Sequence, residues 1–146
     1  KFSPFIAEAA VIGANKPYLS AIICIRFSVL SKWAEQNRVA FTTYSDLASK
    51  PEIEKILIEE VKKVNQSVPT KQIIRKFVLL YKEFDADDDE LTRTKKLRRN
   101  FVINKYDEIV GAIYSEQKSI KIDTIINLQD GGTQRIKTKL NIINME

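Results

Sequence analysis

The sequence YLSAIICI, from Tyr18 to Ile25, is the longest nearly continuous apolar stretch of the chain. An apolar run of this length predicts a buried β-strand. It is far shorter than the roughly 20 apolar residues that a membrane-spanning helix requires. We therefore expect the chain to fold around this strand, and the segments on either side of it indicate what the strand packs against.

Segments before and after this run also predict strands. Residues 7–12 form a second apolar run, joined to the first by GANK at positions 13–16, which is the pattern of a hairpin with a four-residue loop. Residues 74–81, IRKFVLLY, predict another largely buried strand. Near the end of the chain, apolar residues on either side of the turn Asp130-Gly131-Gly132 predict a C-terminal hairpin. The apolar residues of that hairpin are Ile120, Ile122, Ile136, Leu140 and Ile142.

Three helices are expected between these strands. The first spans residues 28–38, where apolar residues recur near the helical period. The second begins at a capping box, Ser49-x-x-Glu52, and runs to about Asn65. The third follows a charged segment and ends near Ser115. The order of elements predicts an α+β domain, in which a small, mostly antiparallel sheet is flanked by helices and followed by the C-terminal β-hairpin.

The composition restricts the chemistry that this domain can perform. The chain has 146 residues, 44% apolar and 29% charged, as in a compact globular domain. Because it contains no histidine, Ser-His-Asp sites, Cys-His sites and His-bearing zinc sites are excluded. The single cysteine, Cys24, lies in the central apolar run, which favours a packing role in a reducing compartment. The net charge of +5 permits anionic partners without selecting one.

An acidic segment, EFDADDDE at positions 83–90, precedes the third helix. Asp85, Asp87 and Asp89 occupy the first, third and fifth positions of a calcium-binding loop. The sixth position is not glycine, however, and the twelfth is Lys96 where a bidentate glutamate belongs. We therefore expect a solvated, mobile loop and no metal site.

A basic segment, TRTKKLRR at positions 92–99, follows directly. Five cations just before a helix are unfavourable, because a helix N-terminus already carries about half a positive charge. Either the neighbouring acids at 87–90 neutralise them or an anionic ligand does. In the second case, a lysine would meet phosphate or carboxylate charge, and Arg93, Arg98 and Arg99 could clamp oxygens bidentately. The residues alone leave both explanations open.

This basic segment resembles the late lysine motif of the adenylate-forming acyl-CoA synthetases. In their long-chain fatty acid branch the motif runs approximately Leu-Thr-x-Thr-x-Lys-x-Lys/Arg, and Leu91, Thr92 and Thr94 favour that branch. The resemblance extends from about Phe5 to Ser115. It includes KPYLSA at 16–21, KWAEQN at 32–37, EEVKKVN at 59–65, FVLL at 77–80 and Lys105-Tyr106.

The resemblance implies roles for individual residues of the motif. Lys96 takes the place of the adenylation lysine, which would stabilise charge in the transition state of the first reaction step. Lys95 stands where many relatives have glycine. Further contacts to phosphate, AMP or CoA are implied for Arg93, Thr94, Arg98 and Arg99. No metal ligand is implied within this chain.

The resemblance also implies a place in a larger enzyme. Residues 1–146 would form a single C-terminal lid domain, with a family-like core at 1–115 and a C-terminal hairpin extension at 116–146. The chain begins without an initiator methionine or a signal-like segment, so we expect it to be excised from a longer protein. The large N-terminal adenylation domain, which binds ATP and the acyl group, would precede Lys1 and be the main partner of this domain.

The intact enzyme would be a long-chain fatty acid CoA ligase. Its fatty acid carboxylate would attack the α-phosphate of ATP to form acyl-adenylate, and the CoA thiol would then displace AMP. ATP, Mg²⁺ and CoA are thus implied for the intact enzyme and none is expected bound to this fragment, which should be inactive alone. The expected location is the cytoplasm, and peripheral membrane association would suit an enzyme that handles long fatty acids.

Two other classes of function compete with this one. The chain could be a purely structural or interaction domain whose basic segment is a surface feature. It could instead bind nucleic acid through residues 93–99, with Phe77, Tyr81 or Tyr106 available for stacking. These aromatic residues fall at core periodicities and no nucleic-acid-binding fingerprint accompanies them, so we expect no nucleic acid partner.

Overall fold

The computed structural model describes residues 3–86, 88–127 and 131–145. Its main sheet has four strands in the order β1-β2-β3-β6. They are β1 (Ile6–Ile12), β2 (Leu19–Ile25), β3 (Ile74–Leu79) and β6 (Ile143–Asn144). β1 and β2 form the predicted antiparallel hairpin, whereas β2 and β3 pair in parallel because helices return the chain between them. The short strand β6, which periodicity did not predict, pairs antiparallel with β3.

The central strand β2 accounts for the apolar run from Tyr18 to Ile25. Every residue from Ser20 to Ile25 is buried, because β2 has a strand on either side and a packed core on both faces. Ile22 and Cys24 face one core. Ala21, Ile23 and Ile25 face the other. A strand covered on both faces reads as a continuous apolar segment.

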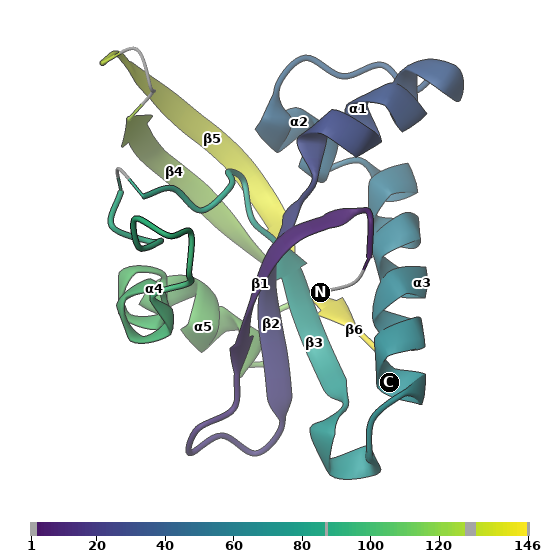
Figure 1. Ribbon diagram of the computed structural model, residues 1–146, viewed down its shortest axis with the longest axis vertical. Helices are drawn as coiled ribbons and strands as arrows, with labels where there is room; N and C mark the ends of the chain where they lie inside the picture. The colour runs from purple at the N-terminus through teal and green to yellow at the C-terminus, as the bar shows by residue number, and fades with distance from the viewer. Residues whose placement is uncertain (1–2, 87, 128–130, 146) are drawn as a thin grey trace.

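Three helices cover one face of this sheet (Figure 1). They are α1 (Phe27–Gln36), α2 (Tyr44–Ala48) and α3 (Pro51–Gln66), and a 3-10 turn, η1 (Thr70–Gln72), leads into β3. The buried side of α3 consists of Ile53, Leu57, Glu60 and Val61. The predicted spans of α1 and α3 are confirmed.

The predicted capping box of α3 is wrong. α2, which was not predicted, occupies the preceding residues, and Ser49 ends it by donating a hydrogen bond from Oγ to the Asp46 carbonyl at 2.7 Å. α3 instead begins after Lys50, without a side-chain cap but with Pro51 in its first turn. The serine therefore stabilises the end of one helix and not the start of the next.

The other face of the sheet is covered by α4 (Arg99–Lys105) and α5 (Asp107–Ile113). A single helix was predicted here, but Tyr106 leaves helical geometry with φ −105° and ψ 33°. The Tyr106 side chain is buried at 5% exposure and points toward the acidic segment. The helix is thus interrupted at Tyr106, whose hydroxyl donates a buried hydrogen bond to the Glu90 carboxylate.

The predicted C-terminal hairpin is confirmed as β4 (Ser119–Asn127) and β5 (Thr133–Asn141), a separate antiparallel sheet. Its apolar side packs on the core shared with α4 and α5, and Ile136 and Leu140 are buried there. Part of the predicted turn, Asp130, lies outside the described residues, and Gly131 has φ +87°. In Figure 1 the end of the hairpin extends away from the main sheet.

The predicted α+β fold, with mostly antiparallel strand pairs and flanking helices, is confirmed. Among the described residues, no helix has the length and apolar character needed to cross a membrane.

Candidate functional site

The basic segment folds into a tight antiparallel ribbon, which we call the Lys96 ribbon (residues 91–97). Leu91 and Leu97 pair at its open end. The Thr92 N–H donates to the Lys96 carbonyl at 2.8 Å, and the Lys95 N–H donates back to the Thr92 carbonyl at 2.9 Å. The Thr92 hydroxyl oxygen also accepts a bond from the Lys96 N–H at 3.0 Å. The backbone of Lys96 is therefore held by the N–H and the hydroxyl of Thr92.

The tip of the Lys96 ribbon is a three-residue turn formed by Arg93, Thr94 and Lys95. Lys95 has φ +67°, in the left-handed region that glycine adopts without steric cost. Hairpins with three-residue turns commonly place glycine at this position. The backbone thus gives a physical reason why glycine suits the position at which this chain has Lys95.

The side chain of Lys96 is exposed at the base of this turn. Among the residues that the structure describes, no carboxylate lies within ion-pair distance of Lys96. One arginine of the basic segment does meet the acidic segment, because Oδ1 of Asp89 is 3.9 Å from Nη1 of Arg98. Local neutralisation by the acidic segment is therefore seen at Arg98 only, within the described residues.

The acidic segment pairs mainly with other lysines. The prediction of a solvated loop is wrong for Glu90, whose side chain is 0% exposed. Its carboxylate accepts hydrogen bonds from Lys82 Nζ, the Tyr106 hydroxyl and the Asp85 N–H, and it forms an ion pair with Lys105 Nζ at 3.0 Å. We call Glu90, Lys82, Lys105 and Tyr106 the Glu90 network.

Electrostatics keep the Tyr106 hydroxyl protonated as a donor. Burial, and then its hydrogen bond to Glu90, raise the pKa of Tyr106 far above its usual value. Burial and the Glu90 charge likewise raise the pKa of Tyr81 to about 12. Tyr106 can therefore only donate to the carboxylate near neutral pH, which fixes the direction of the hydrogen bond.

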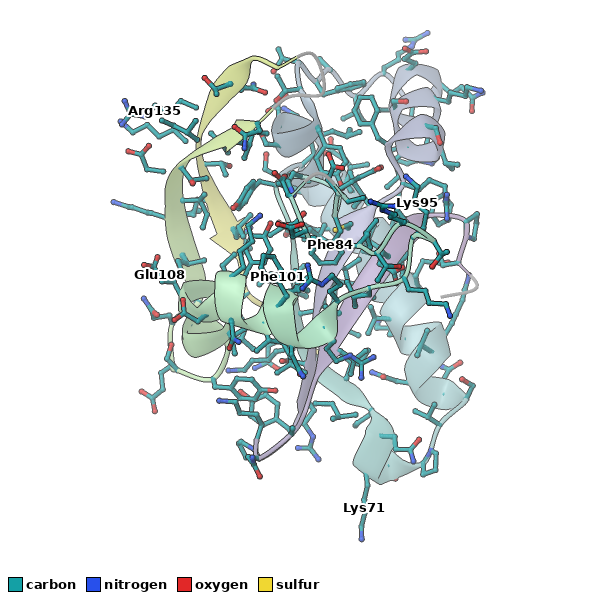
Figure 2. The ribbon with its side chains drawn as sticks, turned by 60° about the vertical axis from the view of Figure 1, so that its left-hand side comes forward. Lys71, Phe84, Lys95, Phe101, Glu108 and Arg135 are labelled. Atoms are coloured by element: carbon teal, nitrogen blue, oxygen red, sulfur yellow. The ribbon has the colours of Figure 1, made fainter. Side chains whose placement is uncertain are left out.

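The Glu90 network lies at the open end of the Lys96 ribbon. The Glu90 carbonyl accepts the Arg98 N–H at 2.9 Å, so residues 90 and 98 continue the ribbon's pairing. Lys82 follows β3, whereas Lys105 and Tyr106 lie at the junction of α4 and α5. In Figure 2, the buried Phe84 lies near the centre of the view and the exposed Lys95 lies to its right.

The remaining predicted site residues diverge. Arg93 and Thr94 lie with Lys96 on the ribbon, and the Thr94 and Thr92 hydroxyls are 3.1 Å apart. The Arg98 guanidinium instead lies 4.9 Å from the centre of the Phe101 ring and donates to the Asp89 carbonyl at 3.0 Å. Arg99 lines a cavity of about 300 Å³ beside β1. The structure therefore groups Arg93, Thr94 and Lys96, and separates Arg98 and Arg99 from them.

The sequence interpretation missed Glu90. It lies in a run that is acidic at six of eight positions, so nothing in the sequence distinguished it from its acidic neighbours. Its place directly before Leu91-Thr92 was the only available signal. Among the described residues, no group of three or more acidic or cysteine side chains could hold a metal ion, and Asp87 of the weak calcium pattern lies outside them.

Comparison with protein families gives a match over most of the chain. The family described as AMP-binding enzyme C-terminal domain matches residues 1–118. A long-chain-fatty-acid–CoA ligase from Mycobacterium tuberculosis is 34% identical over 115 residues, covering 78% of this chain and 19% of that protein. A bovine long-chain-fatty-acid–CoA ligase is 29% identical over 133 residues, covering 80% and 18%. A probable CoA ligase from Humulus lupulus is 29% identical over 126 residues, covering 82% and 18%.

A solved structure supports the fold. The crystal structure of the adenylation domain of a carboxylate reductase from Mycobacterium chelonae aligns with a TM-score of 0.57 and 19% identity. The alignment covers 77% of this chain and 16% of that one. The present chain spans 18–19% of the length of the curated relatives described above.

Proposed function

Because the chain belongs to the family of AMP-binding enzyme C-terminal domains, we propose that residues 1–146 are the lid domain of an AMP-forming long-chain fatty acid CoA ligase. The names of the similar ligases support the substrate class. In the intact enzyme, an N-terminal adenylation domain would hold ATP and the fatty acid. The cytoplasmic location and the peripheral membrane contact expected from the sequence stay predictions.

The proposed role of Lys96 is to stabilise the transition state of adenylation. A fatty acid carboxylate oxygen forms a bond to the α-phosphorus of ATP, the bond to the bridging oxygen breaks, and pyrophosphate leaves. Negative charge gathers on the α-phosphate oxygens as the two anions meet. An ammonium already fixed at that position stabilises this charge more than it stabilises the separated reactants.

One observation carries this proposal. The exposed side chain of Lys96 starts from a backbone held on both sides by Thr92 and has no carboxylate partner among the described residues. A surface lysine with a fixed base and a free ammonium is prepared for an anion brought by another domain. Arg93 and Thr94, on the same ribbon, would contact phosphate, AMP or CoA oxygens. Arg98 and Arg99, which point elsewhere, would contribute less.

Magnesium ions accompany ATP in the proposed reaction, and the described residues of this chain offer them no cluster of ligands. No set of three suitable ligands exists among the described residues. No step of the proposal therefore depends on a metal bound by this domain. ATP and CoA enter the proposal as substrates of the intact enzyme.

The test separates the two half-reactions in the full-length enzyme. Lys96→Ala is expected to slow acyl-adenylate formation by about 10²–10³, as for the loss of one preorganised charge-stabilising donor. Supplied acyl-adenylate should still react with CoA at close to the normal rate. The matched control is Lys95→Gly, which removes an equal charge one residue away and suits φ +67°. Equal losses for both variants, or equal losses in both half-reactions, would contradict the proposal.

A second test uses the 146-residue chain alone. It is expected to unfold cooperatively on heating and to show no ATP–pyrophosphate exchange, because the proposed nucleotide and acyl sites belong to the other domain. Exchange by a pure sample of this chain would contradict its assignment as a lid domain.

A further inference from the structure

We infer that Glu90 is a positioning residue for Lys96: its buried carboxylate, held by Lys82, Lys105 and Tyr106, fixes the direction in which the Lys96 ribbon leaves the domain. This inference rests on the proposed function of Lys96. It concerns a residue that touches no substrate and would act only through the ribbon.

The charge of Glu90 is buried in the folded domain. Glu90 is 0% exposed, so its carboxylate loses its hydration on folding. Two ammonium groups, one hydroxyl and the Asp85 N–H at 3.0 Å replace that water. A carboxylate with this many donors can adopt few other positions, because a displacement would leave the buried carboxylate or the buried Tyr106 hydroxyl without its partner, although Lys82 also has Asp88 at 3.2 Å.

Backbone pairing connects Glu90 to Lys96. The Glu90 carbonyl is bonded to the Arg98 N–H at 2.9 Å, Leu91 pairs with Leu97, and Thr92 pairs with Lys96. The ribbon is thus paired from Glu90 up to the turn. A rotation of residue 90 would tilt the whole ribbon and displace Lys96 with it.

Beyond the Glu90 network, the ribbon is anchored among the described residues only at its base, where Leu91 and Leu97 pack against the core. Residues 92–96 are all exposed, and Leu91 and Leu97 are only partly buried. The tip therefore receives little direction from packing. Its direction comes from the base, where the Glu90 network joins the segment after β3 to the junction of α4 and α5.

The Glu90 network is ionic, although stability alone does not require buried charges. Apolar residues of similar volume often replace buried ion pairs with no loss of stability. A buried ionic network is satisfied in one arrangement only, which favours a role in geometry. Because a misplacement of about 1 Å can cost about 10²-fold in rate, small errors at the base would be visible in adenylation.

The main variant is Glu90→Gln in the full-length enzyme, which keeps the size of the side chain and removes its charge. We expect adenylation by the folded fraction to slow by about 10-fold to 10²-fold, with kcat falling more than the KM for ATP rises. Thioester formation from supplied acyl-adenylate should change by less than about twofold. Tyr106→Phe, which removes one donor and is milder for folding, should slow adenylation by about threefold to tenfold.

The matched control is Glu60→Gln. Glu60 is a second buried carboxylate, 7% exposed, and lies on α3, away from the ribbon. It accepts hydrogen bonds from Ser3, near the start of the chain, and from Lys63 on the same helix. Its loss should lower the thermal midpoint and leave both half-reactions of the folded fraction unchanged. A general loss of stability would thereby be separated from a loss of positioning.

The double variant Glu90→Gln with Lys96→Ala decides the matter. A residue that acts through Lys96 has no effect once the ammonium is gone, so the double variant should be as slow as Lys96→Ala alone. If the two losses multiply, or if Glu90→Gln and Tyr106→Phe slow both half-reactions equally, the inference is overturned. If Lys96→Ala itself leaves adenylation unchanged, the proposed function fails first, and the two failures are distinguishable.

Discussion

Two antiparallel ribbons of the molecule, the β4–β5 hairpin and the Lys96 ribbon, are held in opposite ways. The β4–β5 hairpin has nine-residue strands and lies on the core with an apolar side that includes Ile136 and Leu140. The Lys96 ribbon is much shorter, has an exposed tip and is fixed at its base by the buried charge of Glu90. Apolar packing is non-directional and holds a broad surface, whereas charged hydrogen bonds hold one direction. The comparison teaches that the ribbon proposed for chemistry is the one held by directional contacts.

The largest expected effect on stability is at the base of the Lys96 ribbon. Glu90→Ala leaves the buried Tyr106 hydroxyl and the partly exposed Lys105 without their acceptor, and leaves Lys82 with Asp88 alone, so the free energy of unfolding should fall by about 3 kcal/mol. Urea unfolding of the 146-residue chain measures this change. A loss below about 1 kcal/mol would show that the network contributes little, and the contrast between the two ribbons would disappear.

The β4–β5 hairpin should respond to loss of apolar volume instead. Leu140→Ala removes a side chain that is 6% exposed, and the free energy of unfolding should fall by about 2–4 kcal/mol. In the full-length enzyme, both half-reactions of the folded fraction should remain near normal. Selective loss of CoA affinity with an unchanged melting temperature would instead give the hairpin a direct role in the reaction.

High pH should act on Tyr81, which lies close enough to Glu90 for that charge to raise its pKa, and should spare the β4–β5 hairpin. Because burial raises the pKa of Tyr81 from 10.0 to about 12, its contribution to stability is fully present below pH 10 and is lost as the pH rises through about 12. The free energy of unfolding of the parent chain should fall as the pH is raised from 9 to 11. In Tyr81→Phe this fall should be smaller by about 1 kcal/mol, because the variant has no hydroxyl to ionise at this position. The control is Leu140→Ala, whose effect should be the same at both pH values because neither β4 nor β5 contains tyrosine. Urea unfolding at each pH measures both variants.

The smallest expected effect is at the tip of the Lys96 ribbon. Lys95→Gly relieves the left-handed conformation at φ +67° but adds freedom to the unfolded chain. These opposed terms should leave a gain of about 0.5 kcal/mol in the free energy of unfolding, measured in urea. Lys95→Ala, which keeps the side-chain strain, should show no gain. A loss of stability in the glycine variant would mean that the Lys95 side chain has a stabilising contact.

Periodicity predicted the apolar part of this fold. The run from Tyr18 to Ile25, the alternation in the C-terminal hairpin and the stripe of α3 all record contacts with a core, and each is confirmed. β6 escaped notice because it has only two residues, and α2 because it has only five. Elements this short are set by tertiary pairing and have too few residues to show a period.

The polar part of the structure could not be predicted in the same way. The burial of Glu90 depends on Lys82, Lys105 and Tyr106, which belong to different segments of the chain and meet only in the fold. The break of the predicted helix at Tyr106 depends on the same contact. The motif around Lys96 was visible in the sequence because it is contiguous, and its assigned role stays a prediction.

The pairing of β3 bears on how the chain reaches its native state during synthesis. β3 has β2 on one side and β6 on the other, and the Met145 N–H also donates to the Arg75 carbonyl at 2.8 Å. Until residues 143–144 leave the ribosome, the outer edge of β3 has unpaired backbone groups, which can recruit strands from other nascent chains. We therefore expect β6 to protect the edge of β3 from pairing with other chains. Removal of residues 143–144 should increase aggregation during folding, although it removes little buried surface.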